Sequence, residues 1–151
     1  MLSGAVSNDA NHISGPSRTG EELYNAINKS LKDAGLGSTD IDFISAHGTA
    51  TIYNDEMEAK AITLAQLQQV PINSLKGYYG HTLGAAGVIE SVVAIHSLQQ
   101  NTILPTLGFK QMGVPTPVNI CSSLQKTPLR SCLKTASGFG GCNAAVIFSK
   151  Q

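Results

Sequence analysis

The hydrophobic positions along the chain change period repeatedly, and each change predicts a switch between strand and helix. Apolar and small residues alternate with polar ones over residues 2–7, as they do in a short strand. Apolar residues then recur at helical spacing between Thr19 and Gly35, which predicts an amphipathic helix. Thr19 and Glu22 have the spacing of a capping box at the start of this helix. The chain therefore begins with a strand, a loop and a helix.

The same alternation continues through the middle of the chain. Residues 41–46 are apolar or small except for one aspartate, which indicates a buried strand that ends at His47. An asparagine and two acidic residues at 54–56 favour the start of a second helix. Residues 71–74 are predicted to form a short strand. Residues 82–99 are apolar on nearly every side over their first half, so we expect a third helix that is buried.

The last third of the chain lacks a helical period. Prolines at 105, 115 and 117 interrupt a loop-rich stretch, after which residues 132–137 and 144–148 are predicted to be the two strands of a β-hairpin. This order of strands and helices is typical of an α/β fold with a mixed sheet, mostly parallel and ending in an antiparallel pair. Because no linker or repeat interrupts it, we treat residues 1–151 as one domain.

Composition excludes several classes of protein. The chain has 151 residues, of which 42% are hydrophobic and 13% charged, and this excludes intrinsic disorder. No apolar run reaches the roughly 18–20 residues that cross a bilayer. The first residues also lack the basic and apolar regions of a secretory signal, so we expect a cytoplasmic protein without a membrane segment. The cysteines have neither disulfide nor zinc spacing; they are Cys121, Cys132 and Cys142.

The net charge is zero, but its sign changes along the chain. Residues 1–90 hold five basic and ten acidic residues, a net charge of −5, whereas residues 91–151 hold five basic residues and no acidic ones. The basic part is either a solvated surface or a face for an acidic partner. A nucleic-acid partner is not expected, because the chain has no cluster of Lys and Arg, no Trp and only 5% aromatic residues.

Two loops that follow predicted strands carry the side chains best suited to chemistry. The segment 47–51, HGTAT, comes directly after the buried strand, where α/β sheets place their ligands. The segment 76–87, KGYYGHTLGAAG, runs from a strand end to the predicted third helix. His81 would lie at the N-terminus of that helix, whose partial positive charge favours a neutral imidazole. Neutral His47 and His81 could each donate a hydrogen bond to one oxygen and form an oxyanion site.

Three other features of the sequence are, taken singly, weaker evidence of a functional site. Asp55 and Glu58 lie three residues apart on one helical face and could pair with a buried lysine. The glycines at 80, 84 and 87 leave one face of the third helix without side chains, which predicts the close approach of another backbone. Residues 138–143, GFGGCN, form a glycine turn between the last two strands and present one aromatic ring.

Taken together and in order, these segments resemble a known family. HGTAT followed by Asp55 and Glu58, KGYYGH leading into TLGAAG, and the closing GFGGCNAA are similar to the β-ketoacyl-acyl carrier protein synthases of the elongating, two-histidine type. The resemblance runs from about residue 2 to residue 150 and covers the C-terminal half of that family. It implies the second half of a thiolase-like fold, layered α/β/α with a mixed sheet. It also implies that the half with the nucleophilic cysteine is absent from residues 1–151, so we expect this chain alone to be inactive and to expose apolar surface.

The resemblance assigns catalytic roles to four residues. His47 and His81 match the two histidines that aid decarboxylation of a malonyl thioester. Lys76 matches the family lysine, and Glu58 matches the acid that pairs with it. The carbanion that decarboxylation leaves would attack an acyl thioester on the missing cysteine, in fatty acid or polyketide-type chain elongation.

The resemblance also assigns substrate contacts and partners. Thr49 and Thr51 match hydroxyls that contact the phosphopantetheine arm of an acyl carrier protein. Phe139, between Gly138 and Gly140, matches an aromatic gate beside the acyl cavity. No bound cofactor or metal is implied, since the phosphopantetheine arm belongs to the substrate carrier. The implied partners are the acyl carrier protein and, in the full-length protein, a second copy of the same chain.

Two departures from the family pattern concern the pocket. Residues 135–137 are Thr-Ala-Ser where the family commonly has Asn-Ser-Phe, so a small hydroxyl replaces an aromatic ring and the preferred acyl chain length stays open. Ala50 replaces the common glycine of HGTGT, a change that we expect to be harmless.

Several alternatives stay open at this point. A non-catalytic partner subunit similar to a chain-length factor would share the same half. A thiolase would use Cys142 as a catalytic thiol, although HGTAT and the spacing of KGYYGH favour the condensing enzymes. A dinucleotide loop at 80–87 has the spacing GxxxGxxG rather than GxGxxG. A metal site made of the two histidines and the nearby carboxylates lacks the short ligand spacing of zinc sites.

Overall fold

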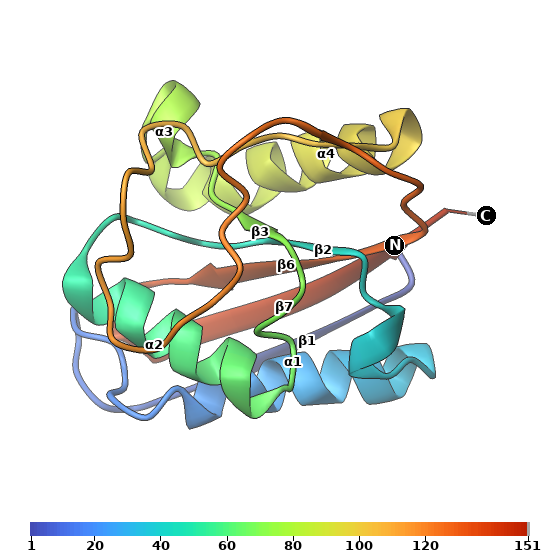
Figure 1. The fold of residues 1–151 in the computed structure, drawn as a ribbon. Coiled ribbons are helices and arrows are strands. Elements are labelled where there is room, and N and C mark those ends of the chain that lie inside the picture. The colour runs from blue at the N-terminus through green and yellow to red at the C-terminus, as the bar shows by residue number, and fades with distance from the viewer. Residues whose placement is uncertain (151) are drawn as a thin grey trace.

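A five-stranded sheet with helices on both faces forms the centre of the chain, whose computed structural model describes residues 1–150 (Figure 1). The sheet order is β1-β7-β6-β2-β3. Its strands are β1 (Ser3–Asn8), β2 (Phe43–Ser45), β3 (Ile72–Asn73), β6 (Ser131–Ser137) and β7 (Cys142–Ser149). One face is covered by α1 (Glu21–Ala34) and α2 (Ile52–Leu64), the other by the short α3 (Lys76–Tyr79) and by α4 (Ala86–Gln100). This is the predicted α/β/α layering with a mixed sheet.

The strands pair in both directions. β2 is parallel to both β3 and β6, whereas β7 is antiparallel to both β6 and β1. The predicted β-hairpin is therefore confirmed, but the prediction of mostly parallel pairing is wrong. The reason is that the first strand joins the sheet at its far edge, beside the last strand, and hydrophobic periodicity carries no information about such a distant pairing. A separate two-stranded sheet joins β4 (Thr102–Ile103) to β5 (Gln125–Lys126).

The start of α1 differs from the predicted capping box. The helix begins after Gly20, which has a left-handed conformation with φ 77°, and no side chain caps it. The hydroxyl of Thr19 accepts a hydrogen bond from the backbone N–H of Glu21 at 3.3 Å, and Glu22 does not complete a box. A Cβ atom at Gly20 would lie 2.6 Å from the carbonyl oxygen of Met57, so the close approach of α2 requires glycine there.

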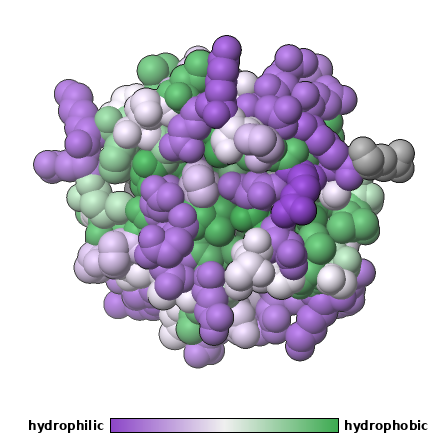
Figure 2. Space-filling view, turned by 45° about the vertical axis from the view of Figure 1, so that its right-hand side comes forward, coloured by the Kyte–Doolittle hydropathy of each residue, from purple (hydrophilic) through white to green (hydrophobic). Residues whose placement is uncertain are grey.

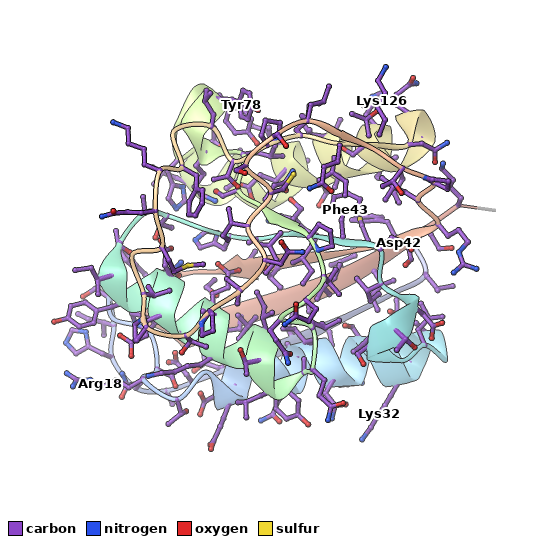
Figure 3. All side chains as sticks on the ribbon, viewed as in Figure 1. Arg18, Lys32, Asp42, Phe43, Tyr78 and Lys126 are labelled. Atoms are coloured by element: carbon purple, nitrogen blue, oxygen red, sulfur yellow. The ribbon has the colours of Figure 1, made fainter. Side chains whose placement is uncertain are left out.

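Apolar side chains fill both spaces between the sheet and its helices. Figure 3 shows Phe43 inside the molecule, while Arg18, Lys32 and Lys126 point outward. The larger cluster lies between the sheet and the helices α1 and α2; among its members are Leu23, Ile27, Ile44, Met57, Leu133 and Ile147. The second cluster lies towards α4 and contains Phe43, Ala94, Leu98, Ile103, Cys121, Leu129, Cys132 and Phe148. Both faces of β2 and β6 are therefore buried, and charged groups on them need partners.

The third predicted helix is shorter and more exposed than expected. α4 begins at Ala86 and is preceded by η2 (Leu83–Ala85), a separate turn of 3₁₀ helix. Val88, Ile89 and Val92 reach the surface, so the prediction of a buried helix is wrong for this chain by itself. The space beside Gly80, Gly84 and Gly87 is also open within the described residues, so no backbone approaches them there. Apolar side chains reach the surface between hydrophilic ones in Figure 2 as well.

No helix within residues 1–150 combines the length and the hydropathy that a membrane crossing requires.

Candidate active site

A cleft of about 920 Å³ opens at the carboxyl ends of β2 and β3. These two strands are parallel neighbours, so the loops that follow them meet at one edge of the sheet. The loop after β4 closes the other side with residues 106–114. Six of the residues that the sequence singles out line the cleft; they are Thr49, Thr51, Asp55, Glu58, Lys76 and His81. The HGTAT and KGYYGH segments are thus brought together, as predicted.

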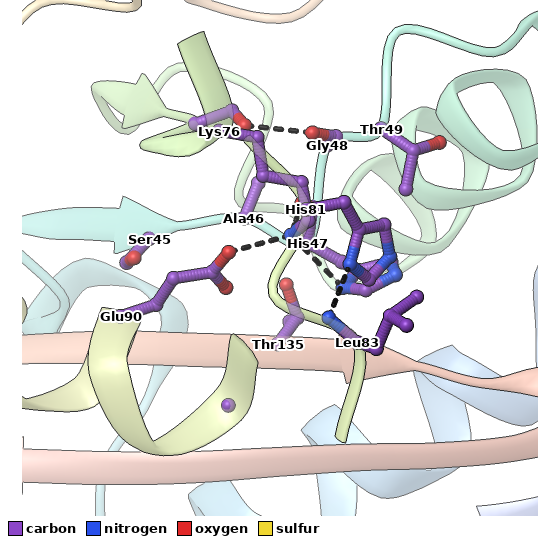
Figure 4. A network of polar contacts seen from close by, with 12 residues as sticks. Ser45, Ala46, His47, Gly48, Thr49, Lys76, His81, Leu83, Glu90 and Thr135 are labelled. Atoms are coloured by element: carbon purple, nitrogen blue, oxygen red, sulfur yellow. Dashed lines mark hydrogen bonds and ion pairs between the residues drawn. The ribbon is translucent and has the colours of Figure 1, made fainter. Parts of the chain in front are cut away.

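The two histidines meet at this cleft, which His81 lines and His47 does not. The ring centroids of His47 and His81 are 5.2 Å apart, and the ring planes are at 80° to each other (Figure 4). His47 is buried at the end of β2, while His81 is exposed in the turn before η2. The predicted convergence of two imidazoles from separate loops is therefore observed.

Lys76 determines which nitrogen of His47 carries hydrogen. Its ammonium donates to the carbonyl oxygen of His47 and to Oε1 of Glu90, at 2.5 Å from the latter, and it lies 3.3 Å from Nδ1 of His47 (Figure 4). An ammonium has three hydrogens to donate and no acceptor, so Nδ1 must be the acceptor in the third contact. The hydrogen of the neutral ring is then on Nε2. Burial lowers the pKa of His47 to about 4, so the ring is neutral at pH 7.

The turn around His81 leads to the same tautomer. The backbone N–H of Leu83 donates to Nδ1 of His81 at 3.0 Å, so this nitrogen also has no hydrogen. The prediction that His81 lies at a helix N-terminus is wrong, because α4 begins only at Ala86 and a local hydrogen bond orients the ring instead. Both imidazoles therefore have Nε2–H as their free donor, which is the arrangement that an oxyanion site requires.

Glu58 binds the backbone of the loop that contains His47 and does not pair with Lys76. Its carboxylate accepts the backbone N–H groups of His47 and Gly48 at 2.8 and 2.9 Å, and the hydroxyl of Thr135 at 2.6 Å. The predicted Glu58–Lys76 pair is wrong: these three donors occupy the Glu58 carboxylate, and Lys76 forms its ion pair with Glu90.

Asp55 contributes to the same loop. Its carboxylate accepts the backbone N–H of Thr49 at 3.1 Å, and burial raises the pKa of Asp55. Glu58 and Asp55 together fix the backbone of the HGTAT segment from one side of α2.

Two buried charges complete the site and are missed by the motif analysis. Glu90 on α4 is fully buried and bridges Lys76 to Lys134 on β6, whose Nζ lies 2.6 Å from Oε2 of Glu90. Burial alone would raise the pKa of Glu90, but the charges and hydrogen bonds of the two lysines keep it below its ordinary value. A sequence signal exists, since Glu90 and Lys134 are lone charges within an apolar helix and an apolar strand, where a charge requires a partner.

The predicted substrate contacts are divided between two places. The hydroxyls of Thr49 and Thr51 are 2.8 Å apart at the cleft. Gly138, Phe139 and Gly140 lie in a turn that does not line the cleft, and the residue Phe139 is 82% exposed. Their substrate-binding roles stay predictions. Within residues 1–150, no three His, Cys, Asp or Glu side chains lie close enough to share a metal ion.

Known proteins are similar to this chain over nearly all of its length. Residues 1–110 match the family described as "Beta-ketoacyl synthase, C-terminal domain". The "3-oxoacyl-[acyl-carrier-protein] synthase 2" of Rhizobium meliloti is 34% identical over 96% of this chain, which spans 35% of that protein. A ketosynthase solved with its type II polyketide acyl-carrier protein has a TM-score of 0.93 and 30% identity; the match covers 99% of this chain and 38% of that one. The ishigamide ketosynthase/chain length factor has a TM-score of 0.93 and 29% identity, covering 99% of this chain and 37% of that one.

Proposed function

The chain belongs to the β-ketoacyl synthase family as its C-terminal domain, and we propose that it supplies the two-histidine half of a 3-oxoacyl-acyl carrier protein synthase. The whole enzyme would join a malonyl thioester to an acyl thioester with loss of CO₂. The observation that carries this proposal is the convergence of two imidazoles, each with a free Nε2–H, beside one cleft. Because the chain spans about a third of the relatives that it matches, the activity of the whole protein is part of the proposal.

In the proposed reaction, the bond between the α-carbon and the carboxylate of the malonyl group breaks. CO₂ leaves, and the electron pair of that bond forms an enolate whose negative charge lies largely on the thioester oxygen. The Nε2–H groups of His47 and His81 donate to that oxygen and stabilise it as the charge develops. A neutral imidazole is a poor acid, so both rings keep their hydrogens and the enolate stays nucleophilic.

The enolate carbon would then attack an acyl thioester. A new carbon–carbon bond forms, the carbon–sulfur bond of the acyl thioester breaks, and the cysteine leaves as thiolate. We infer that this cysteine lies outside residues 1–151. Burial raises the pKa of Cys132 to about 12 and also raises that of Cys121, which makes both thiols poor nucleophiles, and Cys142 does not line the cleft. The position of Cys142 also argues against the thiolase alternative.

We propose an acyl carrier protein as the partner that delivers the malonyl group. Thr49 and Thr51 at the cleft would contact its phosphopantetheine arm, and a structural relative was solved with its acyl-carrier protein. A homodimer and a cytoplasmic location stay predictions from the sequence.

The test is malonyl decarboxylation by the full-length protein. His81→Ala removes one of the two oxyanion donors, so we expect the rate to fall by about 10²–10³-fold. His96→Ala is the matched control, because His96 is exposed on α4 and does not line the cleft, and we expect its rate to stay within about twofold of wild type. Equal rates for the two variants would refute the proposed role of His81. Absence of decarboxylation in the wild type would favour a non-catalytic partner subunit.

A further inference from the structure

Lys134 is a buried lysine that has no part in the mechanism above. It lies on β6, beside β2, and only 3% of the residue is exposed. Its ammonium donates to the carbonyl oxygens of Ser45 and Ala46 at 3.2 Å each and to that of Thr135 at 2.6 Å. It also forms the ion pair with Glu90 at 2.6 Å. Every hydrogen of the ammonium thus has an acceptor.

Stability does not explain a lysine at this position. Removing an ammonium from water costs several kcal/mol, and buried ion pairs can often be replaced by apolar residues without loss of stability. Cys132 and Leu133, which precede Lys134 on the same strand, are apolar and fully buried. A side chain of that kind would fit the layer of β6 at lower desolvation cost.

Lys134 acts on His47 along two routes. Along the first, its charge attracts Oε2 of Glu90 in an ion pair, although that oxygen accepts no hydrogen bond. Oε1 is then left to accept Lys76, and Lys76 in turn faces Nδ1 of His47. Along the second, it holds the carbonyl oxygens of Ser45 and Ala46, the two residues directly before His47. The ammonium of Lys134 therefore contacts both the backbone just before His47 and the carboxylate of Glu90, which positions Lys76.

We propose that Lys134 is a positioning residue of the two-histidine site: through Glu90 it keeps Lys76 against Nδ1 of His47, and so it keeps the hydrogen of that ring on Nε2. The placement of Lys76 and the tautomer of His47 follow from this chain's own contacts. Only the consequence for catalysis rests on the proposed function.

The charges around His47 indicate what the loss of Lys134 would do. His47 is faced by Glu58 from α2, Lys76 from α3, Glu90 from α4 and Lys134 from β6, besides the ring of His81. Two lysines balance two glutamates in this set. Lys134→Met leaves a net negative charge, which favours a second proton on His47. It also frees Glu90 to rotate and to draw Lys76 away from Nδ1.

The experiment is a titration of the His47 ring by ¹⁵N NMR in the 151-residue chain. In the wild type we expect the Nε2–H tautomer throughout the range in which the ring is neutral. In Lys134→Met we expect a mixture of the two tautomers and a titration midpoint higher by roughly one pH unit. Lys60→Met is the control, because Lys60 forms a partly exposed pair with Glu56 on α2, and we expect it to leave both readouts unchanged.

A folded Lys134→Met variant with the wild-type tautomer and midpoint would overturn the proposal. If that variant fails to fold, Glu90→Gln combined with Lys134→Met removes one charge of each sign, and we expect this variant to fold with mixed tautomers. Failure of both variants to fold would assign Lys134 to the fold alone and also overturn the proposal. Because the NMR readout needs no turnover, a positive result together with an inactive wild-type enzyme would reject the proposed function and keep the positioning role.

Discussion

Replacing Glu90 by Gln removes the one negative charge between two buried lysines. Glu90 has no exposed surface, and the side chains of Lys76 and Lys134 are 8% and 3% exposed. The glutamine keeps the shape of the side chain but leaves the two ammonium groups near each other with little access to water. Loss of one partner from a buried ion pair costs about 3–5 kcal/mol, and we expect a loss of that size at pH 7.

The loss should depend on pH in a defined direction. Burial lowers the pKa of Lys134 even with its partner Glu90 present, and loss of the Glu90 charge should lower that pKa further. The unfolded variant then binds more protons than the folded one between the lowered pKa of folded Lys134 and the ordinary lysine pKa of about 10.4. Within that range the stability of the variant should rise with pH.

Urea unfolding followed by circular dichroism measures this loss. Glu56→Gln is the matched control, since Glu56 forms an ion pair with Lys60 at 2.7 Å in which both side chains are about a third exposed. Exposed pairs contribute about 0–1 kcal/mol, so this control should lose little. The reasoning fails if Glu90→Gln loses no more stability than Glu56→Gln, or if its loss is the same at pH 7 and pH 9.5.

Three further predictions concern stability and activity. Burial lowers the pKa of His47 from 6.5 to about 4, so the folded chain binds fewer protons than the unfolded chain between these two pH values. The free energy of unfolding should therefore fall by up to about 3 kcal/mol as the pH falls from 6.5 to 4. In His47→Gln, unfolding measured over the same pH range should lack this decrease. Gly48→Ala should cost about 1–3 kcal/mol in thermal or urea unfolding, because Gly48 has φ +44° and a Cβ atom there would lie 2.6 Å from Cβ of Ser74. In the control Gly87→Ala on α4, the new Cβ atom meets open space, and the chain should be stabilised by roughly 0.5–1 kcal/mol. Equal effects of the two variants would contradict this geometry. The 151-residue chain alone should not elongate an acyl thioester, and turnover by the purified chain in a carrier-protein assay would disprove the inference that the nucleophile lies elsewhere.

The convergence of His47 and His81 could be predicted because it depends on a general property of parallel sheets. His47 directly follows β2, and His81 lies in the segment after β3, beyond the short α3. Because β2 and β3 are parallel neighbours, both segments start from the same edge of the sheet. The strands themselves were evident from short apolar runs between turn residues. Local pattern was sufficient for these features.

The partners of the charged residues could not be predicted in the same way. Glu58 has the sequence position of a partner for Lys76, but its carboxylate accepts the backbone N–H groups of His47 and Gly48. Because every residue except proline has a backbone N–H, the residue types in the sequence do not show which of these groups a carboxylate will accept. The Lys76–Glu90 pair depends on how α4 lies over the sheet, which periodicity does not specify. The lone charges of Glu90 and Lys134 in apolar segments indicate that each needs a partner, but not which residue it is.

The account depends most on the two imidazoles presenting Nε2–H together, and ¹⁵N NMR of both rings in the wild-type chain at pH 7 measures this directly. Two-bond couplings from the ring hydrogens distinguish a nitrogen with hydrogen from one without. We predict that His47 and His81 both show hydrogen on Nε2 and none on Nδ1. Hydrogen on Nδ1 of either ring would remove one donor from the oxyanion site and contradict the mechanism.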